Sequence, residues 1–246
     1  MGAQLAQAVQ KRFKNQTRLI GVHDFRADAA RGLASRLHPA VPVLSLCQLV
    51  RRSDLVIEAA SPQAVRQILP EILRWRRDLM VMSAGGLLEQ SGLIRKTGKA
   101  GIRIYVPSGA ILGLDGLKAA AVGRLSSVTL TTRKPPCALG MGKIGRPKVI
   151  FSGSAREAVK RFPQNINVAA ALSLAGLGPV RTKVRIIADP ALKENVHEVE
   201  AAGDFGTMQI RTRNRPSSAN PKTSQLAIQS AVATLERIVG SFQVGT

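Results

Sequence analysis

Asp24 and His197 each have a side chain that can do chemistry. Each also lies in or at the end of a predicted strand, where a sheet would present that side chain to a ligand. Asp24 closes the segment LIGVHD at 19–24, which predicts a buried strand ending in an acid. In a dinucleotide-binding sheet, an acid at the end of the second strand binds the adenosine ribose hydroxyls. An ordinary strand-end or turn aspartate is the alternative. Arg26 is suited to a 2′-phosphate instead, so the pattern leaves NAD and NADP both open.

His197 lies in a predicted strand at 196–201. An imidazole titrates near neutral pH, so it can accept and return a proton within one turnover. A lone strand histidine is more often structural, and the pattern alone leaves both interpretations open. Glu198 and Glu200 alternate along the same strand, so we expect Glu198 to face away from His197.

Strands and helices alternate along the first 107 residues. Strands are predicted at 19–24, 41–43, 54–60, 79–83 and 103–106, with helices between them and one at the start of the chain. Alternation without a hairpin signal predicts parallel strands with right-handed crossovers, and a ligand at their carboxyl ends. We therefore predict an α/β fold with a Rossmann-like, doubly wound parallel sheet, and a dinucleotide-binding domain over 1–107.

The glycine-rich phosphate loop that should precede the first helix is incomplete. The chain begins MGAQL, so Gly2 can serve only as the third glycine of GxGxxG, and the strand before that motif is missing. A start assigned to an internal methionine explains this most plainly; a cut chain or a degenerate paralogue are the alternatives. We expect weak cofactor binding, because the backbone N–H donors for the pyrophosphate are absent.

The second half has a different pattern. Strands are predicted at 126–133, 149–152, 183–188, 196–201 and 207–213, together with helices at 154–162 and 165–174. Clustered strands of antiparallel type with helices predict an α+β substrate and catalytic domain over 108–223. A closing helix is expected within 224–246.

Composition excludes several classes of protein. Of 246 residues, 45% are hydrophobic and 21% charged, which predicts a folded globular chain. The net charge of +21 suits anionic ligands in general, but eight aromatic residues offer few rings for base stacking, which argues against a nucleic-acid partner. Cys47 and Cys137 form no metal motif. No segment is long and apolar enough for a membrane span, and a cytoplasmic location is expected.

Seven segments resemble the L-aspartate dehydrogenase family. They are DLVIEAASP at 54–62, SGAILGLDGL at 108–117, TTRKPP at 131–136, FPQNINVAAAL at 162–172, NVHE at 195–198, GDFG at 203–206 and NPKTS at 220–224. The resemblance extends over the chain from Gly2. It implies oxidative deamination of L-aspartate with NAD or NADP, giving iminoaspartate and then oxaloacetate and ammonia, with the imine able to feed NAD biosynthesis.

The resemblance also implies roles for individual residues. His197 matches the active-site histidine, and Ala110 and Asn167 match contacts to the nicotinamide cofactor. Because the substrate has two carboxylates, cations must meet them. The candidates are Arg133, Lys134 and Lys222, which lie in matching motifs.

The same resemblance suggests a homodimer.

Two rival hypotheses for the function remain: a non-catalytic degenerate paralogue that acts as a binding or scaffold protein, and a basic protein associated with nucleic acid. A steep loss of binding with salt and no response to NAD would identify the second rival.

Overall fold

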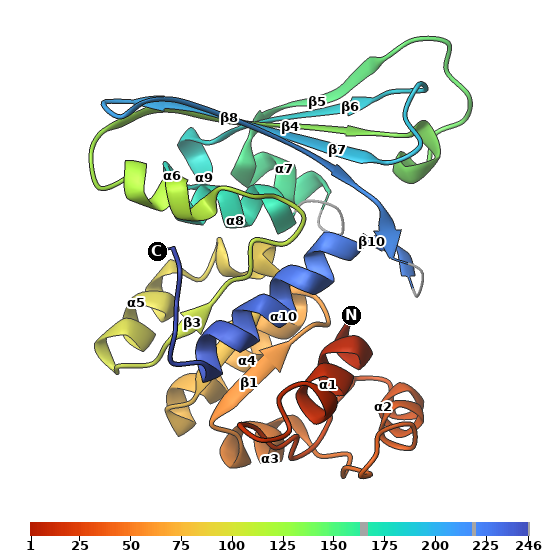
Figure 1. Cartoon of the computed structure of the whole chain (residues 1–246), viewed down its shortest axis with the longest axis vertical. Helices are drawn as coiled ribbons and strands as arrows, with labels where there is room; N and C mark the ends of the chain where they lie inside the picture. Colours follow the sequence, from red (N-terminus) through yellow and green to blue (C-terminus); the bar gives the residue numbers. More distant parts are fainter. Residues whose placement is uncertain (163–166, 218–219, 246) are drawn as a thin grey trace. The chain divides into compact units, whose positions relative to one another are not determined.

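A computed structural model describes residues 1–162, 167–217 and 220–245, and of residues 220–222 it describes the backbone alone. The chain forms two compact units (Figure 1). The first consists of Met1–Pro107 and Ala231–Gln243, and the second of Ser108–Ser230 and Val244–Thr246. The long helix α10 (Gln225–Val239) contributes residues to both.

The first unit is built mainly from short parallel strands and their crossover helices. In chain order its elements are α1 (Gly2–Lys11), α2 (Ala27–Ala34), α3 (Leu46–Arg52), β1 (Leu55–Glu58), α4 (Pro62–Trp75), β2 (Asp78–Val81), the 3-10 helix η1 (Ala84–Leu87), α5 (Ser91–Lys99) and β3 (Ile104–Tyr105). Helix α4 begins where the sequence signal predicts, because the Ser61 hydroxyl accepts from the Ala64 N–H and Pro62 occupies the first turn.

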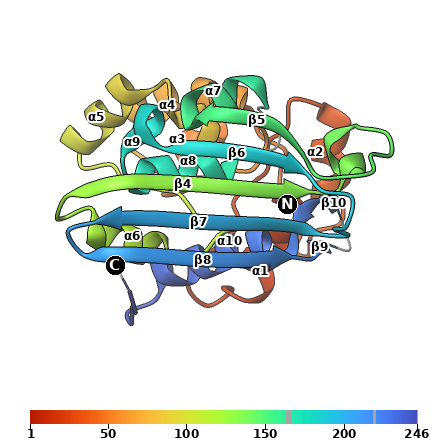
Figure 2. The same cartoon turned by 90° about the horizontal axis from the view of Figure 1, so that it is seen from above.

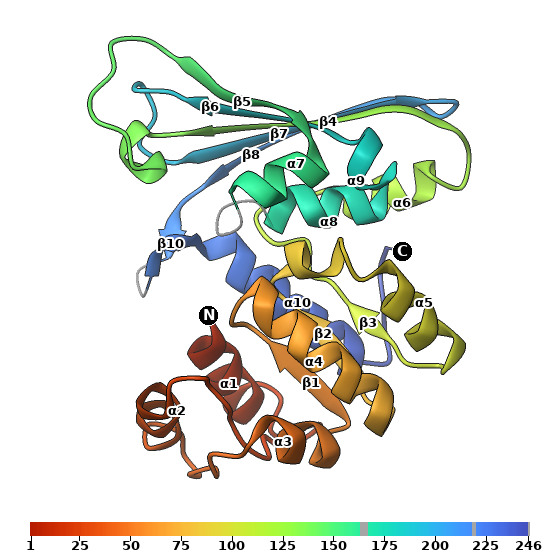
Figure 3. The ribbon, with the colours of Figure 1, turned by 180° about the vertical axis from the view of Figure 1, so that it is seen from behind.

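The sheet of this unit has parallel strands in the order β1-β2-β3, and helices cover both of its faces. Alternate residues of each strand enter different cores. Val56 and Leu79 pack with α4, whereas Met80 packs with α1 and the second half of α10. Helix α10 therefore lies in front of the strands in Figure 1, and α4 lies in front of them in Figure 3. The unit has the predicted doubly wound parallel arrangement.

The predicted strand at 19–24 is shorter than expected. The structure has one parallel bridge, between Val22 and Val43. It is closed by hydrogen bonds from the Val22 N–H to the Pro42 carbonyl and from the Leu44 N–H to the Val22 carbonyl, both 3.0 Å long. Pro42 has no N–H to donate, which limits the ladder at this point.

The second unit combines a sheet with a layer of helices. Its elements are α6 (Leu114–Ala120), β4 (Leu125–Lys134), the 3-10 helix η2 (Pro136–Leu139), β5 (Lys148–Ser154), α7 (Ala155–Arg161), α8 (Asn167–Ala175), α9 (Gly178–Arg181), β6 (Lys183–Ala188), β7 (Asn195–Gly203), β8 (Gly206–Asn214), β9 (Pro216–Ser217) and β10 (Asn220–Ser224). Helix α7 begins with a capping box between Ser154 and Glu157.

Five strands in the order β5-β6-β4-β7-β8 form the large sheet of this unit (Figure 2). Strands β4 and β6 are parallel, and the other neighbours are antiparallel. One face, here called the inner face, packs against helices α6, α7 and α8 through a single apolar core that includes Leu130, Val199 and Leu172. The opposite, outer face has no helix over it in the part of the chain that the structure describes. The predicted α+β arrangement is present, with one parallel strand pair within it.

Among the described residues, no helix has the length and apolar character needed to cross a membrane.

Candidate active site

Five buried polar side chains gather on the inner face of the large sheet, toward one end of three adjacent strands. They are Thr132 and Lys134 of β4, His197 of β7, and Thr212 and Asn214 of β8, here called the polar cluster. Strand register explains the grouping, because Thr132 pairs with His197 and His197 pairs with Thr212. Lys134 and Asn214 each lie two residues further along, and so share that face.

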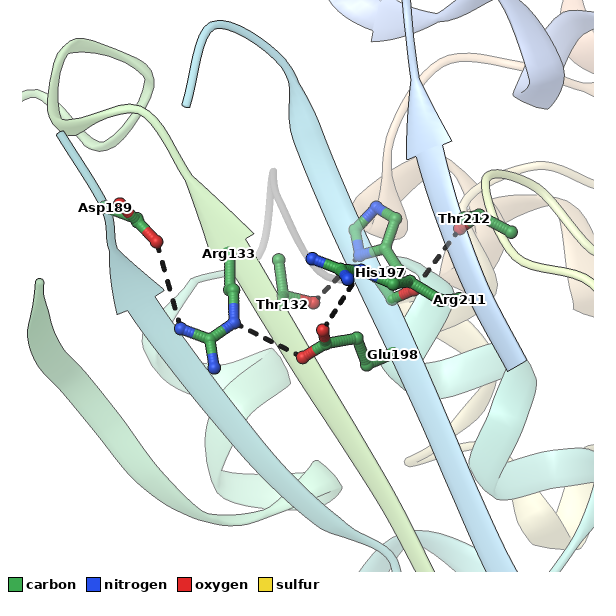
Figure 4. Close-up of polar contacts among 7 residues, drawn as sticks. All are labelled: Thr132, Arg133, Asp189, His197, Glu198, Arg211 and Thr212. Carbon is green, nitrogen blue, oxygen red and sulfur yellow. Dashed lines mark hydrogen bonds and ion pairs between the residues drawn. The ribbon is translucent and has the colours of Figure 1, made fainter. Parts of the chain in front are cut away.

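His197 is the imidazole of this cluster, and only 4% of its surface is exposed. Its Nδ1 lies 2.9 Å from the Thr132 hydroxyl (Figure 4). Burial, which is the larger cause, and the positive charge of Lys134 together lower the pKa of His197 to about 3. The imidazole is therefore neutral in the free protein, and its Nδ1 is hydrogen-bonded to Thr132.

Lys134 brings a cation into the same buried region, where only 7% of its surface is exposed. Burial lowers the pKa of its ammonium group. A desolvated ammonium interacts with a carboxylate more strongly than a surface lysine does. Lys134 is thus suited to a small anion held beside the imidazole.

Arg133 is directed to the other side of the sheet. Its guanidinium forms ion pairs with Glu198 at 3.3 Å and with Asp189 at 3.9 Å, and Glu198 also pairs with Arg211 at 3.3 Å (Figure 4). Glu198 thus faces away from His197, as strand alternation predicts. Arg133 and Lys134 are adjacent in one strand and cannot meet the same ligand, so the expectation that Arg133 binds the substrate is not retained.

The turn at Gly109 and Ala110 is attached to this cluster. Gly109 has a positive φ of 69°, which suits a residue without Cβ. The Ala110 carbonyl accepts hydrogen bonds from the Thr212 hydroxyl at 3.2 Å and the Asn214 Nδ2 at 3.0 Å. Ala110, predicted as a cofactor contact, is therefore held directly against the strand that neighbours His197.

Asn167 begins helix α8 and is partly buried. A Cβ placed on Gly109 would lie 3.9 Å from Val168, the next residue of that helix. The start of α8 is therefore close to the Ala110 turn. The backbone of Lys222 lies in β10, and its side chain is outside what the structure describes.

Two residues predicted to bind the dinucleotide lie in the first unit. Gly2 starts helix α1, and a Cβ placed on it would be 3.8 Å from Ala59, just after β1. Asp24 follows the Val22 bridge with an exposed carboxylate, and one of its oxygens accepts from the Arg26 N–H at 2.9 Å. A helix N-terminus beside the carboxyl end of a strand, together with an exposed acid, fits a pyrophosphate and a ribose.

Glu58 is a buried acid that the sequence pattern did not single out. It ends β1 with 2% of its surface exposed. Its carboxylate accepts hydrogen bonds from the N–H groups of Ala60, Ser61 and Ser83 and from the Ser83 hydroxyl, at 2.7–2.9 Å. Burial raises its pKa, against the opposing effect of these four donors. The signal available in the sequence was a single acid within an apolar strand.

Thr132, Thr212 and Asn214 were also missed, because threonine is common in strands and their positions on one face depend on register. Among the described residues, no three His, Cys, Asp or Glu side chains are grouped so that they could hold a metal ion.

Comparisons with known proteins relate the chain to dehydrogenases. The model of the family described as aspartate dehydrogenase, C-terminal, matches residues 115–238, and the model described as homoserine dehydrogenase, NAD binding domain, matches residues 1–107. An L-aspartate dehydrogenase of Methanosarcina barkeri is 42% identical over 265 residues, covering 100% of this chain and 96% of the relative. One of Methanothermobacter thermautotrophicus is 47% identical over 227 residues, covering 91% and 87%.

A solved structure agrees with them. The aspartate dehydrogenase of Thermotoga maritima superposes with a TM-score of 0.77 at 28% identity, covering 96% of this chain and 95% of that one. The likeness therefore extends over both units.

Proposed function

The chain belongs to the aspartate dehydrogenase family, and from that premise we propose that it oxidises L-aspartate with NAD or NADP, releasing ammonia and oxaloacetate through iminoaspartate. The observation that carries the site assignment is the buried pair on one sheet face, the neutral imidazole of His197 beside the cation of Lys134. Such a pair supplies a proton acceptor and a counter-ion for a carboxylate in one desolvated place.

We assign dinucleotide binding to residues 1–107 and catalysis and substrate binding to residues 108–223, followed by the closing helical segment 224–246. A bound nicotinamide would supply the acceptor for the hydride from the α-carbon of aspartate. Asp24 would hold the ribose and the start of α1 at Gly2 the pyrophosphate. Ala110 would let the ring approach the backbone closely, and the Asn167 amide would bind the ribose or carboxamide.

Lys134 would bind a carboxylate of the substrate. Its placement on the inner face, shared with His197 and not with Arg133, supports this choice. Lys222 remains a candidate for the second carboxylate because of its position in the matching motif.

His197 would take a proton from the α-ammonium group, so that a lone pair forms the C=N bond as hydride leaves. Nε2 is the base in the tautomer in which Nδ1 carries the proton and donates to the Thr132 hydroxyl oxygen, 2.9 Å away. A bound carboxylate at Lys134 offsets the positive charge that lowers the imidazole pKa, and the imidazole becomes a better base when the substrate is present. Water then adds to the imine, and the products are oxaloacetate and ammonia.

The test is the reduction of cofactor by L-aspartate, followed by absorbance with NAD and with NADP. Replacing His197 with Ala should lower turnover at least about 100-fold, as loss of general acid-base catalysis does. His38→Ala, at an exposed histidine, is the matched control. Turnover that survives in His197→Ala contradicts the site assignment, and absence of aspartate-dependent reduction in the unmodified chain contradicts the function.

We also propose a homodimer formed through the outer face of the large sheet. This face has no helix over it among the described residues. Two cations and two anions compensate one another on it, because Arg133 pairs with Glu198 and Asp189 and Arg211 pairs with Glu198. Reversing the central charge with Glu198→Arg would leave three adjacent cations and should shift the chain to monomer in sedimentation equilibrium. An unmodified chain that sediments as a monomer would rule the dimer out.

We propose a cytoplasmic location as well, which the free thiols of Cys47 and Cys137 support.

A further inference from the structure

Asn214 supplies the amide of the polar cluster, and 2% of its surface is exposed. Its Nδ2 donates to the Ala110 carbonyl at 3.0 Å and to the Thr212 hydroxyl at 3.3 Å. A carbonyl oxygen can only accept, so this contact sets which end of the amide is the NH₂ group. The orientation of the Asn214 side chain, and hence the place of its oxygen, is therefore determined.

The Asn214 Oδ1 is buried and has no hydrogen-bond partner among the described residues. Leaving a buried carbonyl oxygen unpaired costs free energy, because the group has lost its water and gained nothing in exchange. The donor side of the same amide is fully used. A buried acceptor without a partner, at a fixed position next to residues assigned to the reaction, points to a ligand that supplies the missing donor.

The strand register places this acceptor on the same side of His197 as Lys134. Strands β4 and β8 both run antiparallel to β7, so they run in the same direction. Lys134 follows Thr132 by two residues and Asn214 follows Thr212 by two, on either side of β7. Two strand spacings separate them, about 10 Å, and both side chains project from the same face. A cation and a neutral acceptor thus flank the strand that holds the imidazole.

We propose that Asn214 binds the reactants through Oδ1, which accepts a hydrogen bond from a ligand N–H. This inference rests on the proposed function. Two nitrogen groups of the reactants have this chemistry, the amino group of aspartate and the carboxamide of the nicotinamide. If the amino group is the donor, Asn214 selects amino acids over 2-hydroxy acids. A hydroxyl has one O–H to share between His197 and Asn214, whereas an amine has enough N–H donors for both.

The first experiment compares ligands on the unmodified chain. L-malate replaces the amino group of aspartate with a hydroxyl, and the acetylpyridine analogue of the cofactor replaces the carboxamide NH₂ with a methyl group. Binding of the reduced cofactors is measured by fluorescence, and binding of the two acids by competition. We expect at least about tenfold weaker binding for one of the two replacements, equal to the loss of one well-made hydrogen bond.

The second experiment assigns that preference to Asn214. Asn214→Leu removes the acceptor and the donor to Ala110. Thr212→Val removes the other donor to the same carbonyl, together with the hydroxyl that accepts from Asn214 Nδ2, but leaves Asn214 Oδ1 in place. A KM for aspartate that rises in Asn214→Leu beyond the change in Thr212→Val, with cofactor binding unchanged, assigns the amino group. Weaker binding of the natural cofactor but not of the acetylpyridine analogue assigns the carboxamide.

Equal binding within each ligand pair, on a chain that oxidises aspartate, overturns the inference and leaves the function intact. So does an Asn214→Leu variant whose preferences match those of Thr212→Val. A chain that does not oxidise aspartate contradicts the proposed function instead, so the two failures are distinguishable. The ligand comparison needs no variant and stands even where Asn214→Leu does not fold.

Discussion

His197 illustrates how burial sets the chemistry of a single residue. Its pKa of about 3 compares with 6.5 for an ordinary histidine. Desolvation disfavours the imidazolium, and the Lys134 charge adds to that effect. The same burial that keeps the base neutral for catalysis also makes folding depend on pH.

Between pH 6.5 and about 3 the unfolded chain holds a proton on this residue that the folded chain does not. The free energy of unfolding should therefore fall as pH drops through that window, by up to about 1.4 kcal/mol per pH unit from this group. Urea titrations between about pH 4 and 7 measure the slope. His197→Gln should lower this slope by the contribution of one proton. Equal slopes in His197→Gln and the unmodified chain would contradict the assigned pKa.

The crossover loops after β1 and β2 are joined by hydrogen bonds to a single carboxylate, that of Glu58. Glu58 accepts from Ala60 and Ser61 in the first loop and from Ser83 in the second. The loops also touch near Gly86, where a Cβ would lie 2.7 Å from the Pro62 carbonyl oxygen. The carboxyl ends of these parallel strands, where a dinucleotide binds in folds of this kind, are therefore held in one arrangement.

Replacing Glu58 with Gln should destabilise this arrangement. The amide NH₂ cannot accept, so it would face an N–H donor, and the buried donor would lose its partner at a cost of about 1–3 kcal/mol. Urea unfolding and hydrogen exchange at the amides of Ala60, Ser61 and Ser83 measure this. Glu89→Gln, at an acid half-exposed beside Arg66, should cost less than about 1 kcal/mol. Comparable losses in both variants would refute the role of Glu58.

The whole molecule has 36 basic and 15 acidic residues. A net charge of +21 attracts anions over a distance set by the ionic strength, about 30 Å at 0.01 M salt and about 10 Å at 0.1 M. The dinucleotide is a phosphorylated anion, so this field should increase the rate at which it associates with the protein.

We expect the association rate of reduced cofactor to fall several-fold between about 0.01 M and 0.1 M NaCl, because screening shortens the reach of the charge. The fall should be steeper for NADPH than for NADH, since NADPH has an additional phosphate. Stopped-flow fluorescence measures both rates, and sucrose at matched viscosity serves as the uncharged control. Rates that do not depend on salt would show that the field has no part in binding.

The sequence alone predicts the alternation of strands and helices and the division into a doubly wound part and an α+β part. It also contains the motifs whose resemblance to a known family indicates His197. These features depend on residues close together in the chain, whose periodicity and motifs are visible directly. The strand at 19–24 was predicted too long, because its length depends on a partner segment that contains Pro42.

Only the tertiary structure decided which residues surround His197. Thr132 is 65 residues away in sequence and Asn214 meets Ala110 across 104 residues. A shift of one residue in register would have exchanged Lys134 for Arg133 on the inner face. Register depends on pairing between distant strands and on what each face buries. A local pattern contains no information about that pairing, and so the composition of the site followed from the fold.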